Sequence, residues 1–210
     1  SYTTVVGKDA LTASTGGSYD VAIGYSAMAN ATGSNSNNVA VGAWALGTNS
    51  GAKSSLVAVG YAALGGVSTG ARLVGVGYNA LNAIQTANDS TAVGYNALAL
   101  DTGGSNTAVG SGALDANTTA AGNIAMGVNA LGAVTTATDN IAIGNNAGDA
   151  ITTGGTSNVF IGTNSGGSLT SGDENIAIGY LSLYYNQSGV RNIGIGYGAL
   201  DGNANFNNSI

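Results

Sequence analysis

The sequence has 210 residues and contains no cysteine, no proline and no histidine. Without cysteine no disulfide can staple the chain, so its stability has to come from backbone hydrogen bonds and packing. Without histidine a Ser-His-Asp triad cannot form, and metal ligation falls to carboxylates and carbonyls. The chain has 36 glycines, but the absence of proline and of a three-residue period excludes a collagen.

Charged residues are also scarce. They make up 7% of the chain, and only 4 of them are Lys or Arg. Four cations cannot form the basic surface that nucleic acids require, so we predict no nucleic-acid partner. No apolar run approaches the roughly 18 residues of a membrane span, so we predict no membrane insertion. The hydrophobic fraction of 44% argues against a disordered linker.

What the sequence does contain is a repeat. Twelve glycines recur at intervals of 16 to 18 residues over the whole chain, a spacing typical of repeat architectures. We number positions within each copy from this glycine and predict that it forms a corner, because glycine tolerates backbone angles that a Cβ forbids. The predicted corners are Gly7, Gly24, Gly42, Gly60, Gly77, Gly94, Gly110, Gly127, Gly144, Gly162, Gly179 and Gly196.

A short apolar run precedes each corner, as in Asn38-Val39-Ala40-Val41-Gly42. Position −3 is β-branched in every copy, and position −1 is Val or Ile in all but one. Side chains two residues apart in a strand share a face, and β-branched residues favour strands. Each run therefore predicts a strand, and we expect positions −3 and −1 to face inward.

Position −2 lies on the opposite face and is almost always alanine or glycine. Such small residues favour close packing of another backbone against that face, and we expect a partner chain there; the alternative is a loop of the same chain. The candidate inter-chain strip is Ala22, Ala40, Ala58, Gly75, Ala92, Ala108, Ala125, Ala142, Ala177 and Gly194.

The residues between one corner and the next strand are predicted to bring the chain back and complete one coil. Position +3 is Ala or Ser in all copies, and Leu or Met follows at +4 in most of them. Turn-forming Thr, Ser, Gly, Asn and Asp fill the remainder. We therefore predict an all-β chain, a parallel β-solenoid of about twelve coils of 16–18 residues that forms one domain over residues 1–210.

Aromatic residues recur directly after the corner. In a solenoid they would stack as a ladder, which either stabilises the coils or offers a carbohydrate-binding strip. This candidate ligand surface is Tyr25, Tyr61, Tyr78, Tyr95, Tyr180 and Tyr197. Trp44, at position +2, departs from the repeat, and we interpret it as a local packing or surface feature.

The copies also carry a family resemblance, which two of them illustrate. Asn140-Ile-Ala-Ile-Gly144 resembles the head repeats of trimeric autotransporter adhesins, and Thr91-Ala-Val-Gly-Tyr-Asn-Ala-Leu98 resembles the repeats of bacteriophage tail fibres. The resemblance extends over essentially the whole chain. It implies a left-handed β-roll, an extracellular location on a virion or a cell surface, and a role in attachment, with a cell-surface glycan or receptor as a possible partner.

The candidate inter-chain strip also predicts self-association. Three chains that present it to a common axis would bury it, so we predict a homotrimer; a lateral dimer and an end-to-end filament are the alternatives. Neither end shows a capping segment, and a bare coil edge invites strand pairing. The chain is therefore either part of a longer fibre or a protomer that stacks end to end.

We predict no enzymatic activity, no cofactor and no metal site. The acidic residues are scattered in loops and form no aspartate ladder of the calcium-binding β-roll type. The leading prediction is a structural or adhesive fibre. The alternatives are a self-assembling extracellular filament and a glycan- or ice-binding surface, of which ice binding ranks last because threonine is confined to irregular loops.

Overall fold

The computed structural model describes residues 2–13, 17–33, 36–48, 54–202, 205 and 207–210. The chain divides into two compact units, Ser1–Ser105 and Asn106–Ile210. Within the described residues there are twelve strands and no helix. The repeat runs through both units, and the single domain over residues 1–210 stays a prediction.

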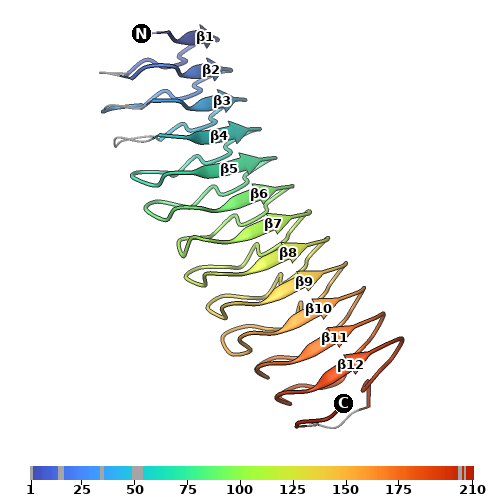
Figure 1. Cartoon of the computed structure of the whole chain (residues 1–210). Coiled ribbons are helices and arrows are strands. Elements are labelled where there is room, and N and C mark those ends of the chain that lie inside the picture. Colours follow the sequence, from blue (N-terminus) through green and yellow to red (C-terminus); the bar gives the residue numbers. More distant parts are fainter. Residues whose placement is uncertain (1, 14–16, 34–35, 49–53, 203–204, 206) are drawn as a thin grey trace. The chain divides into compact units, whose positions relative to one another are not determined.

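Every copy of the repeat contributes one short strand (Figure 1). The strands of the first unit are β1 (Thr4–Val6), β2 (Val21–Ile23), β3 (Val39–Val41), β4 (Leu56–Val59), β5 (Leu73–Val76) and β6 (Thr91–Val93). Those of the second unit are β7 (Thr107–Val109), β8 (Ile124–Met126), β9 (Ile141–Ile143), β10 (Val159–Ile161), β11 (Ile176–Ile178) and β12 (Ile193–Ile195).

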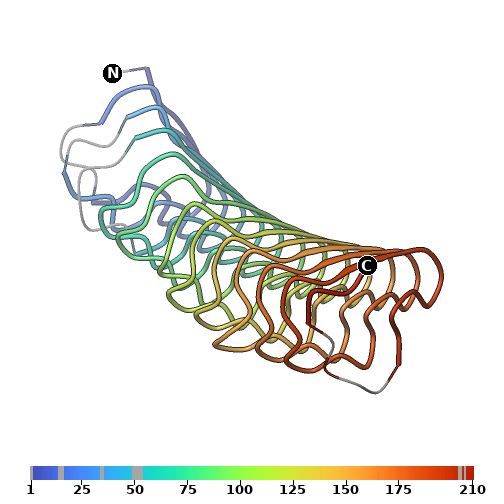
Figure 2. The same cartoon turned by 60° about the horizontal axis from the view of Figure 1, so that its bottom comes forward.

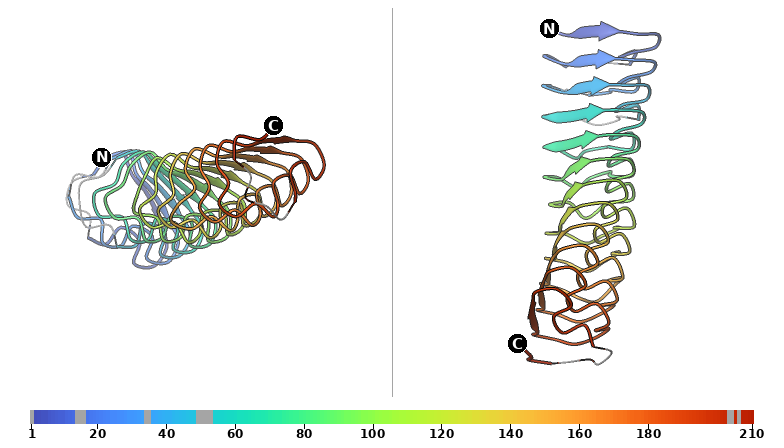
Figure 3. Two further views of the ribbon diagram at one scale, coloured as in Figure 1. Left: turned by 90° about the horizontal axis from the view of Figure 1, so that it is seen from below. Right: turned by 90° about the vertical axis from the view of Figure 1, so that its right-hand side faces the viewer.

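The strands of each unit are parallel, and their order in the sheet follows the sequence. Equivalent residues pair, so Ala22 lies beside Ala40. Between strands the chain returns through a long loop, which closes each coil (Figure 2). The right-hand view of Figure 3 shows the strands of the first unit lying one above another with a common direction. The prediction of an all-β, parallel β-solenoid is confirmed.

The inner and outer faces of the sheet are the reverse of the prediction. The strip predicted to meet a partner chain is buried within its own chain, where all eight of its alanines have no exposed surface and both of its glycines are buried. They are Ala22, Ala40, Ala58, Gly75, Ala92, Ala108, Ala125, Ala142, Ala177 and Gly194. Positions −3 and −1 lie on the outer face instead.

The reason is the leucine at +4. A Cβ built on Gly75 would lie 3.1 Å from Cγ of Leu64, in the preceding coil, and one built on Gly194 would lie 3.4 Å from Cγ of Leu183. The leucine fills the narrow interior, so the residue opposite it on the strand must be small. The small residues do mark close packing, but against the same chain.

Backbone geometry explains why this interior residue is leucine and not valine or isoleucine. Leu64, Leu81 and Leu98 all have φ near +51°. Positive φ is a severe steric outlier for β-branched residues. Position +4 therefore selects a large apolar side chain that is not branched at Cβ.

One coil has a large residue at position −2, and glycines at position +4 make room for it. Phe160 occupies position −2 in β10 and is fully buried. The +4 residues of its own coil and of the preceding coil are Gly166 and Gly148. A Cβ on Gly148 would come within 2.7 Å of the Phe160 ring, and one on Gly166 would overlap it. One large ring thus replaces two leucines.

The corner glycines have two separate requirements. All twelve have φ between +123° and +145°, a region that L side chains rarely adopt. In addition, a Cβ on Gly24 would lie 2.6 Å from the carbonyl oxygen of Gly42 in the next coil. The coils therefore stack backbone on backbone at this position.

These two requirements are separable by mutation. Gly179→Ala violates both requirements, because alanine disfavours this φ and its Cβ would lie 2.6 Å from the carbonyl carbon of Gly196. No described atom lies within 4 Å of a Cβ built on Gly196, so Gly196→Ala violates only the requirement on φ. We expect Gly179→Ala to cost about 3–4 kcal/mol and Gly196→Ala about 1–2 kcal/mol in chemical denaturation. Equal losses would show that stacking adds no constraint.

The packing around Phe160 predicts a rescue. Gly166→Leu alone should destabilise the protein by about 3 kcal/mol through overpacking, and Phe160→Ala alone by about 3–5 kcal/mol through a cavity. The triple variant Phe160→Ala, Gly148→Leu, Gly166→Leu restores the common coil and should lie within about 1 kcal/mol of the parent. Strictly additive losses in thermal unfolding would contradict this account.

Candidate functional site

The outer face of the sheet is an apolar surface. At positions −3 and −1 it carries only Val, Ile, Met and Thr. Every one of these side chains in β1–β12 is partly or fully exposed, for example Ile143 at 39% and Met126 at 43%. We call these two rows the outer strip. A contiguous exposed apolar surface is a candidate interaction site.

The tyrosine row borders the outer strip. Interstrand hydrogen bonds continue past the corner, as from Gly24 N to the Val6 carbonyl at 2.8 Å and from Ser26 N to the Lys8 carbonyl at 3.0 Å. The coil-to-coil hydrogen bonds thus continue on both sides of position +1. All six predicted tyrosines are exposed by 45% or more: Tyr25, Tyr61, Tyr78, Tyr95, Tyr180 and Tyr197.

Most of these tyrosines stack on one another. Tyr61, Tyr78 and Tyr95 lie with ring centroids 5.1 and 5.3 Å apart and interplanar angles of 11° and 15°. Tyr180 and Tyr197 stack in the same way at 5.4 Å. Because each ring covers its neighbour's face, the stack presents mainly edges and hydroxyls. A sugar needs an open ring face, so this geometry favours the stabilising role.

Trp44 lies beside Tyr25 but in a different geometry. The ring centroids are 5.4 Å apart and the interplanar angle is 76°. The indole remains 41% exposed and lines a surface groove of about 270 Å³ together with Ala62, Gly65 and Asn82. The sequence singled out Trp44 as irregular but gave no sign of the groove, since Ala62, Gly65 and Asn82 come from later coils.

A buried ladder of asparagines was missed as well. At position −4 the second unit places six asparagines with no exposed surface: Asn106, Asn123, Asn140, Asn158, Asn175 and Asn192. Each Oδ1 accepts a backbone N–H from the next coil, as from Asn175 N to Asn158 at 2.8 Å. The Nδ2 of Asn158 also donates to the Gly172 carbonyl at 2.9 Å. These amides tie neighbouring coils together.

The ladder is shorter in the first unit. Asp20 accepts both the backbone N–H and the Nδ2 of Asn38, at 3.0 and 3.1 Å. Leu56 and Leu73 then occupy the ladder position of the next two coils. Burial raises the pKa of the Asp20 carboxyl, although the hydrogen bonds from Asn38 act in the opposite direction.

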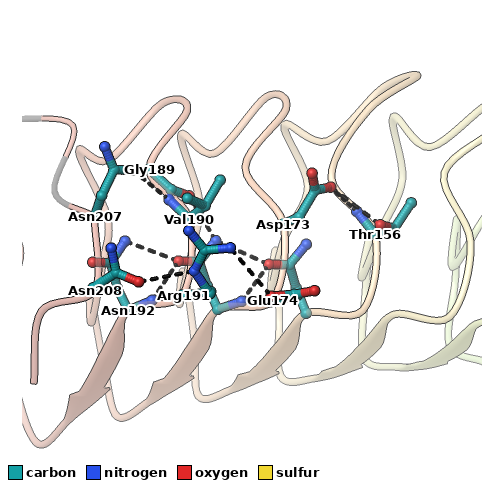
Figure 4. A network of polar contacts seen from close by, with 11 residues as sticks. Thr156, Asp173, Glu174, Gly189, Val190, Arg191, Asn192, Asn207 and Asn208 are labelled. Carbon is teal, nitrogen blue, oxygen red and sulfur yellow. Dashed lines mark hydrogen bonds and ion pairs between the residues drawn. The ribbon is translucent and has the colours of Figure 1, made fainter.

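Charged side chains gather at position −5. The guanidinium of Arg72 donates from Nη2 to Asp89 at 2.8 Å, and this hydrogen bond holds the pKa of the Asp89 carboxyl below its usual value. In the second unit Nε of Arg191 donates to Asn208 at 2.8 Å, while its Nη1 lies 4.0 Å from Glu174 (Figure 4). These exposed contacts cross from coil to coil and form no pocket.

The threonine loops are more regular than predicted. Thr118 Oγ1 donates to the Thr135 carbonyl at 3.0 Å, and Thr135 Oγ1 donates to the Thr152 carbonyl at 3.2 Å. The expectation of irregular threonine loops is therefore wrong for these coils. Their hydroxyls are committed to the backbone of the next coil, which does not favour an ice-binding role.

No metal centre emerges from the described part of the chain. Its residues include no group of three His, Cys, Asp or Glu side chains close enough to hold a metal ion. The candidate surfaces are therefore the outer strip and the Trp44 groove. A search of the same residues for a helix long and apolar enough to cross a membrane finds none.

Comparison of the sequence with protein-family models and with curated proteins, and of the structure with solved structures, finds no match.

Asp20 generates a prediction about pH. Because its pKa is raised in the folded state, the folded protein binds more protons than the unfolded chain between the two pKa values, and stability falls as pH rises through that range. Asp20→Asn installs the residue found elsewhere in the ladder. We expect it to stabilise the protein at pH 7 by about 1 kcal/mol or less and to flatten the acid-range dependence.

Denaturant titrations between pH 3 and pH 7 would measure this effect. Asp89→Asn is the matched control: the pKa of Asp89 is lowered, so removing its charge should lower stability at neutral pH. A loss of stability in Asp20→Asn at pH 7 would contradict the assignment.

Proposed function

We propose that this chain is a structural, non-catalytic segment of an extracellular attachment fibre and that it assembles with further copies of itself through the outer strip. The observation that carries the proposal is the exposed, charge-free outer strip on a β-solenoid. The location on a virion or a cell surface follows from the resemblance of the coils to tail-fibre and adhesin-head repeats.

The size of the outer strip supports an interface. Six parallel strands spaced about 4.8 Å apart extend about 29 Å, and the two rows span roughly 10 Å, so each unit offers on the order of 300 Å². This is the size of the largest apolar patch on a typical monomer, which is itself often an interaction site. Two such units per chain favour burial against a partner.

A second copy of the chain suits this surface better than an unrelated protein does. Each chain repeats its outer strip at the strand spacing, so two copies match in period along the sheet. Most soluble oligomers are closed symmetric assemblies of identical chains. The adhesin-head resemblance favours three copies. This homotrimer differs from the one expected from sequence in its contact residues, which lie at positions −3 and −1.

Charge placed on the outer strip tests the proposal. The double variant Ile143→Lys, Ile178→Lys brings like charges together in any assembly that buries these rows. We expect it to weaken association at least a hundredfold and to give a monomer by sedimentation equilibrium, with an unchanged circular dichroism spectrum. Thr136→Lys, on an exposed returning loop, should leave the trimer intact. A monomeric parent protein, or a lysine variant that stays trimeric, would overturn the proposal.

A further inference from the structure

Trp44 occupies an unfavourable backbone position. Its φ is +62°, and it is the one tryptophan in the chain. Positive φ is usual at this position of the repeat, but a bulky residue is uncommon at such an angle. The chain itself prefers asparagine here: five other coils place it at +2 with φ between +53° and +55°, namely Asn79, Asn96, Asn129, Asn146 and Asn164.

The coil that follows Trp44 is built from small residues where it meets the groove. Ala62 holds the equivalent +2 position, and Gly65 and Gly66 follow at +5 and +6. All three line the groove of about 270 Å³. Because these residues are small, the indole is not covered by a side chain of the next coil, whereas most of the tyrosines lie face to face.

Two polar side chains complete the lining, and both are oriented by the backbone. Asn82 donates from Nδ2 to the Ala62 carbonyl at 2.8 Å, and the Thr48 hydroxyl donates to the Gly65 carbonyl. Asn82 carries a second Nδ2 hydrogen besides the one in this bond, so the groove presents a donor as well as two acceptors, the Asn82 Oδ1 and the Thr48 hydroxyl oxygen. Hydroxyl groups, which both donate and accept hydrogen bonds, match this set of side-chain atoms.

We propose that the Trp44 groove binds one sugar ring of a neutral glycan. The C–H face of a pyranose packs on the indole, and its hydroxyls donate to Asn82 and Thr48. The inference rests on the proposed attachment function and gives its target a chemical class. The volume suits a single ring, near the lower limit of small-molecule sites. Several copies in one fibre would raise the avidity.

The lining discriminates against other ligands. The lining residues that the structure describes include no Asp or Glu, so among them a cationic ligand such as a quaternary ammonium would contact the indole but no carboxylate. These described residues include no Lys or Arg either, so among them an acidic sugar or a phosphate finds no counter-charge. An uncharged ligand with one apolar face and several hydroxyls fits the residues that are present.

Two substitutions taken from the chain's own repeat test the groove without endangering the fold. Trp44→Asn restores the common residue at +2, and Ala62→Asn, at φ +53°, fills the groove while keeping the tryptophan. The probes are cellohexaose and N-acetylchitohexaose, titrated by calorimetry. We expect at least one to bind the parent protein, Ala62→Asn to weaken that binding at least tenfold, and Trp44→Asn to abolish it.

The lone tryptophan supplies an independent readout. Binding should shift the emission of the parent protein, and Trp44→Phe should retain part of the affinity because it keeps an aromatic face. Tyr185→Ser, which removes an exposed aromatic side chain outside the groove, should bind as the parent does. All variants should be as stable as the parent or, for Trp44→Asn, more stable.

Three results would overturn the inference: neither hexasaccharide binds, choline or a sulfated glycan binds in preference, or Trp44→Asn binds as tightly as the parent. Sedimentation of the same samples separates this failure from failure of the fibre proposal. A trimer that binds no sugar would contradict only the assignment of the Trp44 groove. A monomer that binds sugar would contradict only the proposed assembly through the outer strip.

Discussion

Close stacking of backbone on backbone at the corner glycine is the constraint on which the rest of the coil depends. Where Gly24 meets Gly42, no Cβ can be accommodated between the coils. Fixing the corner at this separation lets the strands pair in register and sets the narrow interior. The leucine at +4 fills this interior, so the residue at −2 that packs against it must be small. The β-branched residues of the strand therefore face outward. A surface that would otherwise be polar thereby becomes apolar.

The interior also shows how a thin solenoid closes without disulfides. In the second unit, buried asparagines bridge successive coils through both the carbonyl oxygen and the amide nitrogen, as Asn158 and Asn175 do. In the first unit, Leu56 and Leu73 replace part of this ladder with apolar contact. Both solutions serve the same end, because each satisfies or avoids buried polar groups one coil at a time. Cohesion is distributed along the array and is not concentrated in one core.

The sequence predicted the period, the strand positions and the corners, because glycine spacing and β-branched runs are local signals. It failed on which face of the strand is inside, since alternation groups residues by face without assigning the face. Val39 and Val41 are more hydrophobic than Ala40, and hydrophobicity alone placed them inward; the deciding fact was the left-handed backbone of the leucine at +4. The Trp44 groove could not be predicted, because Ala62 and Asn82 reach it from two further coils. The one available signal was a large aromatic residue where other coils place asparagine.

Phe160 has a consequence for how the chain finds its fold. Because the coils are nearly identical, a strand can pair out of register with a copy one repeat further along the chain. One coil is then left outside the stack. Nearly everywhere such a slip would exchange one alanine for another at little energetic difference. At β10 it would drive the phenyl ring into a leucine and leave Gly148 and Gly166 facing an empty space. A single non-repeating contact thus gives a periodic molecule an origin from which its coils are counted.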